Sequence, residues 1–269
     1  MRLLVFTDLD GTLLNHDDYS WKRAQPALEK LSALSIPVIL VTSKTRTEVE
    51  VLRREMGLDE PFVVENGGGV FFPEHYEKLD VGESTIASPY RLRVLGRSYF
   101  EIRSFVENHR DRFAIEGFGD MGADRIVELT GLDRGQARLA AAREFTEPFL
   151  LDDEEQLPKL REVAADHGLK ITTGGRFYHL MGDTQDKGRA VRVVTEIFGR
   201  TWGEEPKAIG LGSSLSDHSM LEQVDLPVVI PGVSEELEML LGGYAAIANH
   251  PGCRGWNESV LALIEELFS

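Results

Sequence analysis

The sequence contains almost no cysteine, and this limits both its chemistry and its expected compartment. Cys253 is the single cysteine among 269 residues, so no disulfide can form within the chain. No neighbouring motif marks this thiol as a nucleophile, and we expect a structural or incidental role. A chain without disulfides fits a reducing compartment.

Long hydrophobic runs are also missing. No stretch approaches the roughly 18–20 consecutive apolar residues of a membrane-spanning helix. The apolar run between Arg2 and Asp8 is too short for a signal peptide. We therefore expect a cytoplasmic protein without a membrane partner.

Basic residues are in deficit. The 29 Lys and Arg residues face 45 Asp and Glu residues, which gives a formal net charge of −16. Such a chain repels a phosphate backbone, so we expect no nucleic-acid partner. A small anionic substrate responds to its local site more than to the total charge, and that class stays open. The length suits one large domain or two modest ones, as a monomer or homodimer.

Two aspartates follow a short apolar run at the start of the chain. Leu3 to Phe6 predicts a buried strand, and Asp8, Asp10 and Gly11 come directly after it. Ligands bind at the carboxyl edge of open α/β sheets, although Asp and Gly are also ordinary turn residues. The full string Asp-Leu-Asp-Gly-Thr-Leu-Leu, residues 8–14, resembles the first motif of the haloacid dehalogenase superfamily of phosphotransferases.

This resemblance implies a specific division of work. Asp8 would be the nucleophile that takes the phosphoryl group, and Asp10 the general acid for the leaving alcohol and then the base for water. A carboxylate is ionised at neutral pH and can form a covalent intermediate. Because its charge repels a phosphate, a Mg²⁺ ion is expected between them.

The order of the expected elements indicates an α/β fold. Apolar periodicity predicts helices at 21–34, 47–56, 190–198 and 256–268, and strands at 37–41, 62–72, 206–211 and 226–230. Alternating strands and helices imply a Rossmann-like parallel sheet with right-handed crossovers. Three glycines at 67–69 interrupt one strand, and we expect a turn between two short strands rather than a phosphate cradle.

The middle of the chain has a different character. It contains shorter, more alternating apolar segments, such as 125–130, and helix-like runs at 99–107, 134–143 and 156–167. Segments 169–173 and 177–181 flank Gly174 and Gly175, which predicts a β-hairpin. We interpret residues 83–186 as an inserted α+β cap domain, and residues 1–82 and 187–269 as the core domain.

The second and third motifs of the superfamily also have matches here. Thr42 follows the second strand and would hold phosphoryl oxygens, with Ser43 beside it, although both residue types also cap helices. Lys187 begins a helix, where a positive charge is unfavourable. The resemblance assigns it to neutralising charge on the nucleophile and phosphate. We expect Lys44 near the substrate.

The fourth motif departs from the superfamily pattern, which resembles GDxxND. Asp217 is present, but Ser213 stands at the first acid and Ser216 at the asparagine. A hydroxyl is a weaker, neutral ligand for magnesium. We expect Mg²⁺ to be held by Asp8, the Asp10 carbonyl, Ser213, Asp217 and water, with weaker affinity or with a compensating acid elsewhere.

Further segments resemble the mannosyl-3-phosphoglycerate phosphatase family. They are residues 42–48, 64–68, 120–121, 130–132, 147–149, 174–182 and 255–257. The resemblance implies magnesium-dependent hydrolysis of mannosyl-3-phosphoglycerate to mannosylglycerate, a compatible solute. The Arg176 guanidinium is suited to bind the substrate carboxylate through two parallel hydrogen bonds, and His179 would be a second contact. The alternatives are a solvated arginine and a packed histidine.

Three other functions fit the same sequence. The substrate could be another sugar phosphate, such as glucosyl-3-phosphoglycerate, or the protein could be a phosphomutase. The replacement at Ser213 also permits a phosphosugar-binding protein with weakened catalysis.

Overall fold

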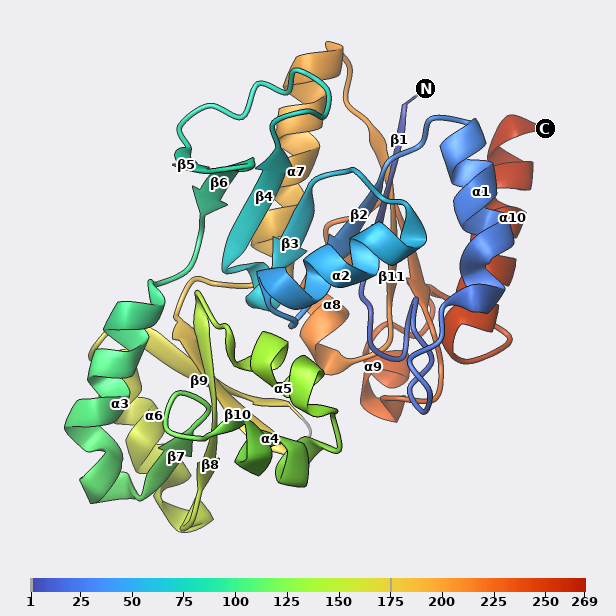
Figure 1. Ribbon diagram of the computed structural model, residues 1–269. Helices are drawn as coiled ribbons and strands as arrows, with labels where there is room; N and C mark the ends of the chain where they lie inside the picture. The colour runs from blue at the N-terminus through green and yellow to red at the C-terminus, as the bar shows by residue number, and fades with distance from the viewer. Residues whose placement is uncertain (1, 175) are drawn as a thin grey trace.

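A nine-stranded sheet forms the larger part of the molecule (Figure 1). The computed structural model describes residues 2–174 and 176–269. The strand order is β13 (Ala246–Ile247), β12 (Leu226–Val229), β11 (Lys207–Gly212), β1 (Leu3–Thr7), β2 (Val38–Val41), β3 (Phe62–Val64), β4 (Gly69–Pro73), β6 (Tyr90–Val94) and β5 (Thr85–Ala87). Neighbours from β13 to β3 pair in parallel, and the pairs from β3 to β5 are antiparallel. The predicted α/β class with a Rossmann-like parallel sheet is confirmed.

Helices cover both faces of this sheet. One face carries α1 (Gln25–Ala33), α2 (Arg46–Met56) and α10 (Gly252–Phe268). The other carries α7 (Lys187–Trp202), α8 (His218–Leu221) and α9 (Glu235–Leu240). Along β1, Leu3 and Val5 enter the first core while Leu4 and Phe6 enter the second. Both faces are therefore buried, and the strand is one continuous apolar run.

A second, four-stranded sheet forms the smaller unit, which lies below the large sheet in Figure 1. Its antiparallel order is β7 (Ile115–Gly117), β8 (Thr146–Leu151), β10 (Phe177–Gly182) and β9 (Leu169–Gly174). One face packs on α3 (Tyr99–Phe113) and α6 (Leu157–Ala165). A small separate core contains α4 (Ala123–Thr130) and α5 (Arg134–Ala141).

Two strands in the range expected for the cap belong to the large sheet. β5 and β6 lie within the 83–186 range assigned to the cap, but β6 pairs with β4 of the large sheet. β5 is largely exposed and β6 alternates between buried and exposed residues, so neither carries a strong apolar signal. We propose that the chain enters the cap at 95–98 and returns at 183–186.

The segment at 125–130, whose apolar residues look alternating in the sequence, is helical. It lies in α4, which begins after Gly122 and ends at Gly131 in the left-handed conformation. Ile126 is buried, and Val127 packs against the same small core. The expected hairpin is confirmed for β9 and β10, while Gly175 lies outside the described residues.

The glycines at 67–69 do form a turn between short strands. Residues Glu65–Gly67 make a 3₁₀ turn, η2, between β3 and β4. Gly67 has φ +89°, and a Cβ there would lie 2.1 Å from the carbonyl oxygen of Asp186. The absence of a side chain therefore lets this core turn touch the start of α7. Across the described ranges, no helix combines the length and apolarity needed to cross a bilayer.

Candidate active site

Asp8 lies immediately beyond the central strand of the large sheet. Its backbone N–H donates to the carbonyl of Leu211 at 3.0 Å, which continues the pairing of β1 with β11. The chain then turns through Gly11 at φ +77°, where a Cβ would meet Val233 at 2.5 Å. This turn places Asp8 and Asp10 at the carboxyl edge of the parallel strands, as the sequence predicts.

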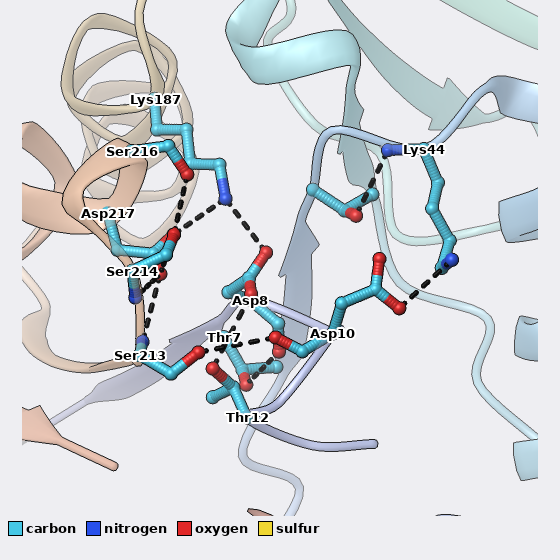
Figure 2. Close-up of polar contacts among 11 residues, drawn as sticks. Thr7, Asp8, Asp10, Thr12, Lys44, Lys187, Ser213, Ser214, Ser216 and Asp217 are labelled. Carbon is cyan, nitrogen blue, oxygen red and sulfur yellow. Dashed lines mark hydrogen bonds and ion pairs between the residues drawn. The ribbon is translucent and has the colours of Figure 1, made fainter. Parts of the chain in front are cut away.

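Lys187 joins Asp8 to the fourth motif (Figure 2). Its buried ammonium donates to Asp8 Oδ1 at 2.8 Å and to Asp217 Oδ1 at 2.6 Å. The other oxygen of Asp217 accepts the backbone N–H groups of Ser213 and Ser214, both at 2.9 Å. Asp217 thus fixes the lysine, and the lysine contacts Asp8 across 179 residues of sequence.

The electrostatic balance of this cluster favours another cation. Two buried carboxylates, Asp8 and Asp217, share the single ammonium of Lys187. Burial, and then the charge of Asp217, raise the pKa of Asp8 to about 7 even though Lys187 opposes the shift. Burial would lower the pKa of Lys187, but the two carboxylates raise it overall. An additional cation beside Asp8 would stabilise its ionised form.

Lys44 contacts Asp10 in this structure. Its ammonium lies 3.0 Å from Asp10 Oδ1 and 3.8 Å from Glu48 Oε1, and it sits over the ring of Tyr19. Lys44 does not line the cavity that contains Asp8. Its contacts therefore hold the Asp10 side chain, and its expected place near the substrate stays a prediction.

Thr42 and Ser43 follow β2 at the same sheet edge. The Thr42 hydroxyl is fully buried and accepts the N–H of Lys44 at 3.1 Å. Within the described residues, no hydrogen bond joins Thr42 to Asp8. Ser43 lines the cavity. The helix cap that the sequence offered as an alternative is made by Thr45 instead, at the start of α2.

A cavity of about 640 Å³ separates the core edge from the cap sheet. This volume is typical of sites for small molecules. The core contributes the charged groups at one side, and the hairpin of β9 and β10 contributes the other. Its lining includes Asp8, Asp10, Ser43 and Lys187 from the core, and Lys170, Thr172, His179 and Met181 from the cap.

The two cap residues expected at the substrate have different positions. His179 lines the cavity, and its Nδ1 has no hydrogen-bond partner among the described residues. Burial, and then the charge of Arg143, lower its pKa to about 4, so the ring is neutral at neutral pH. Arg176 is exposed and does not line the cavity. A neutral His179 suits hydroxyl groups better than a carboxylate.

Lys170 is one of the cavity-lining residues that sequence reasoning missed. It lies on β9 and lines the cavity, although nothing in the sequence analysis selected it. The available signal was its alternation with the apolar residues Leu169 and Ile171, which places it on the opposite face of a strand.

The oxygen atoms beside Asp8 are of the type that magnesium binds, but the Ser213 hydroxyl and the Asp10 carbonyl are both neutral. The Ser213 hydroxyl donates to the Asp10 carbonyl at 3.2 Å, beside the Asp8 carboxylate (Figure 2). Magnesium takes oxygen ligands and commonly keeps several waters. The Asp217 carboxylate already accepts hydrogen bonds from Lys187 and from two backbone N–H groups. Over 2–174 and 176–269, no group of three His, Cys, Asp or Glu side chains could hold a metal ion.

The fold and this site indicate a class of hydrolases, and the comparisons with known proteins identify the same class. Residues 5–89 match the family model for haloacid dehalogenase-like hydrolases. A solved haloacid dehalogenase-like hydrolase from Bacteroides thetaiotaomicron has the same fold over 100% of both chains, with a TM-score of 0.71 at 16% identity.

Two curated relatives identify a family within this class. The glucosyl-3-phosphoglycerate/mannosyl-3-phosphoglycerate phosphatase of Persephonella marina is 48% identical over 265 residues, which is 98% of each chain. The protein of the same name from Methanococcoides burtonii is 41% identical over 269 residues, also 98% of each chain. The chain therefore belongs to the glucosyl-3-phosphoglycerate/mannosyl-3-phosphoglycerate phosphatase family.

Proposed function

We propose that this protein hydrolyses mannosyl-3-phosphoglycerate to mannosylglycerate and phosphate, with glucosyl-3-phosphoglycerate as a second substrate. The names of relatives that match nearly the full length support the substrate class. The observation that carries the chemistry is the Asp8 carboxylate, buried at a sheet edge and bonded to Lys187 at the cavity between core and cap.

The proposed reaction proceeds in two displacements. The Asp8 carboxylate attacks phosphorus, a new oxygen–phosphorus bond forms, and the bond to the glycerate oxygen breaks. Asp10 gives its proton to that leaving oxygen. Water then attacks the phosphorus of the aspartyl-phosphate and loses a proton to Asp10. The bond between Asp8 and phosphorus breaks, so phosphate is released and the Asp8 carboxylate is restored. Lys187 balances negative charge beside Asp8, and Asp217 keeps its ammonium there.

A magnesium ion would be held by Asp8, the Asp10 carbonyl, Ser213 and water. When bound, it would reduce the repulsion between Asp8 and the phosphate. We assign Asp217 to positioning Lys187, because both of its oxygens already accept hydrogen bonds. In the same proposal Ser43 faces the substrate, whereas Lys44 positions Asp10.

Phosphate release from a set of substrates tests this function. The purified chain is assayed with Mg²⁺ on mannosyl-3-phosphoglycerate, glucosyl-3-phosphoglycerate, mannose 6-phosphate and p-nitrophenyl phosphate. We expect the highest kcat/KM for the two sugar phosphoglycerates. Conversion without phosphate release would identify a phosphomutase. Binding without turnover at every magnesium concentration would identify a phosphosugar-binding protein, and either result would refute the proposal.

A further inference from the structure

One face of the cap hairpin lines the cavity, and the strand register defines that face. Lys170 pairs with Met181, and Thr172 pairs with His179, in the antiparallel ladder of β9 and β10. All four residues line the cavity. The alternate residues of these strands, such as Ile171 and Leu180, are buried in the cap core. The pleat therefore presents Lys170 to the ligand space.

The Lys170 side chain is partly shielded from water and has no ion-pair partner among the described residues. The side chain is half-buried, and burial is the main cause that lowers its pKa. Asp186 and Asp183 oppose that shift from a distance, but no ion pair joins Lys170 to any carboxylate in the described part of the chain. A partly desolvated cation in a cavity is stabilised when an anion occupies the adjacent space.

The other three cations near the site either have carboxylate partners or lie outside the cavity lining. Lys187 lies between two carboxylates, and Lys44 pairs with Asp10 and does not line the cavity. Arg176, the cation expected to bind the substrate carboxylate, is exposed and outside the lining. Of these four cations, Lys170 alone lines the cavity and has no ion-pair partner among the residues that the structure describes.

We propose that Lys170 binds the carboxylate of the substrate's glycerate unit and selects for substrates that carry it. This inference rests on the proposed function. The phosphate binds at Asp8 on the core side, and the carboxylate lies toward the cap. Thr172 and the neutral His179, next to Lys170 on the same face, are suited to hydrogen-bond the uncharged hydroxyl groups.

The test compares ligands that differ only by the carboxylate. Lys170→Met removes the charge but keeps most of the apolar stem. 3-Phosphoglycerate and glycerol 3-phosphate are measured as competitive inhibitors of p-nitrophenyl phosphate hydrolysis. In the native protein 3-phosphoglycerate should bind more tightly. In Lys170→Met that preference should fall by roughly 10- to 100-fold, since a hydrogen bond to a charged group contributes about 1.5–3 kcal/mol.

Controls separate this role from a structural one. Lys159→Met removes an exposed lysine of the same cap that pairs with Glu162, and it should leave the preference unchanged. Lys170→Arg keeps the charge and should restore most of the preference. The proposal is overturned if Lys170→Met weakens both inhibitors equally, or if Arg176→Met causes the carboxylate-specific loss instead.

The same measurements distinguish this inference from the proposed function. KM for mannosyl-3-phosphoglycerate should rise in Lys170→Met with little change in kcat, while Lys159→Met, outside the cavity, should leave kcat/KM for p-nitrophenyl phosphate within about twofold. If the native protein hydrolyses p-nitrophenyl phosphate but neither sugar phosphoglycerate, the proposed function fails. The inhibitor preference still reports whether Lys170 recognises a carboxylate.

Discussion

Asp8 is the residue on which the proposed reaction depends, and its replacement gives the sharpest residue-scale prediction. Asp8→Asn keeps the size of the side chain and one oxygen that Lys187 can contact, but removes the carboxylate that attacks phosphorus. We expect kcat to fall by at least about a thousandfold with the fold intact. Phosphate release and circular dichroism measure the two effects, and near-native turnover would exclude a covalent intermediate on Asp8.

Ser213 gives a second residue-scale prediction, about metal binding. Ser213→Asp would place a carboxylate beside the Asp10 carbonyl, where the native hydroxyl is neutral. We expect Mg²⁺ to bind at least about tenfold more tightly, because magnesium sites use one or two carboxylates. Calorimetric titration with Mg²⁺ measures this without turnover.

A matched control comes from the same loop. Ser216→Asp adds the same charge at an exposed position that does not contact the Asp10 carbonyl. A similar gain in both variants would show that total charge, and not a ligand beside Asp10, sets the affinity.

Individual site residues were predictable where they follow strands in the expected order. Asp8 and Lys187 stand at a strand end and a helix start, which the topology of a parallel sheet brings to one edge, and the resemblance to the superfamily selected these two residues. Lys170 was not predictable in this way. Its side chain reaches the cavity only because the hairpin register turns that face of β9 toward the core. Arg176 was chosen for its residue type together with the family resemblance of residues 174–182.

At the scale of elements, η2 joins the core to the cap. The buried Glu65 carboxylate accepts the N–H groups of Glu144 and Phe145 at 2.7 and 3.0 Å. It also accepts the Thr146 hydroxyl at 2.6 Å. These partners lie just before and at the start of β8, in the cap. A single core turn therefore fixes the entry of one cap strand.

Glu65→Gln should weaken this connection. The amide keeps one acceptor oxygen, but its NH₂ group faces donors and leaves buried hydrogen-bonding groups unpaired. We expect the free energy of unfolding to fall by roughly 2–3 kcal/mol, measured by urea denaturation. Glu162→Gln, which removes an exposed carboxylate paired with Lys159, should change it by less than about 0.5 kcal/mol. Equal effects would show that Glu65 does not join the two units.

Elements that bury continuous apolar faces were the predictable ones. The strands β1, β2 and β11 and the helices α2, α7 and α10 all appear close to their expected positions. The short α4 was mistaken for an alternating segment, because eight residues give too few turns to establish a helical period. β8 was missed because it contains Thr146 and Glu147, which are buried through polar contacts rather than apolar packing.

At the scale of the whole molecule, the cavity lies between the core domain and the cap, and each of these units has its own hydrophobic core. The core provides Asp8, just beyond β1, and Lys187, at the start of α7, while the cap hairpin provides Lys170 and His179. Sequence order could predict the insertion, but not which cap face meets the core. That face depends on contacts distant in sequence, such as Glu65 with Thr146 and Thr45 with Leu139.

A ligand that contacts both units should therefore protect both from local opening. Asp8→Asn is used with mannosyl-3-phosphoglycerate and Mg²⁺, so that the substrate remains intact. Saturation at 100 times Kd stabilises the bound state by about 2.7 kcal/mol. Amide hydrogen exchange should slow in β9 and β10 of the cap and in the 212–217 loop of the core, but not in α10, which packs on one outer face of the large sheet. Slowing confined to the core would show that the cap does not bind the substrate, and recognition by the cap would be excluded even if phosphate release were confirmed.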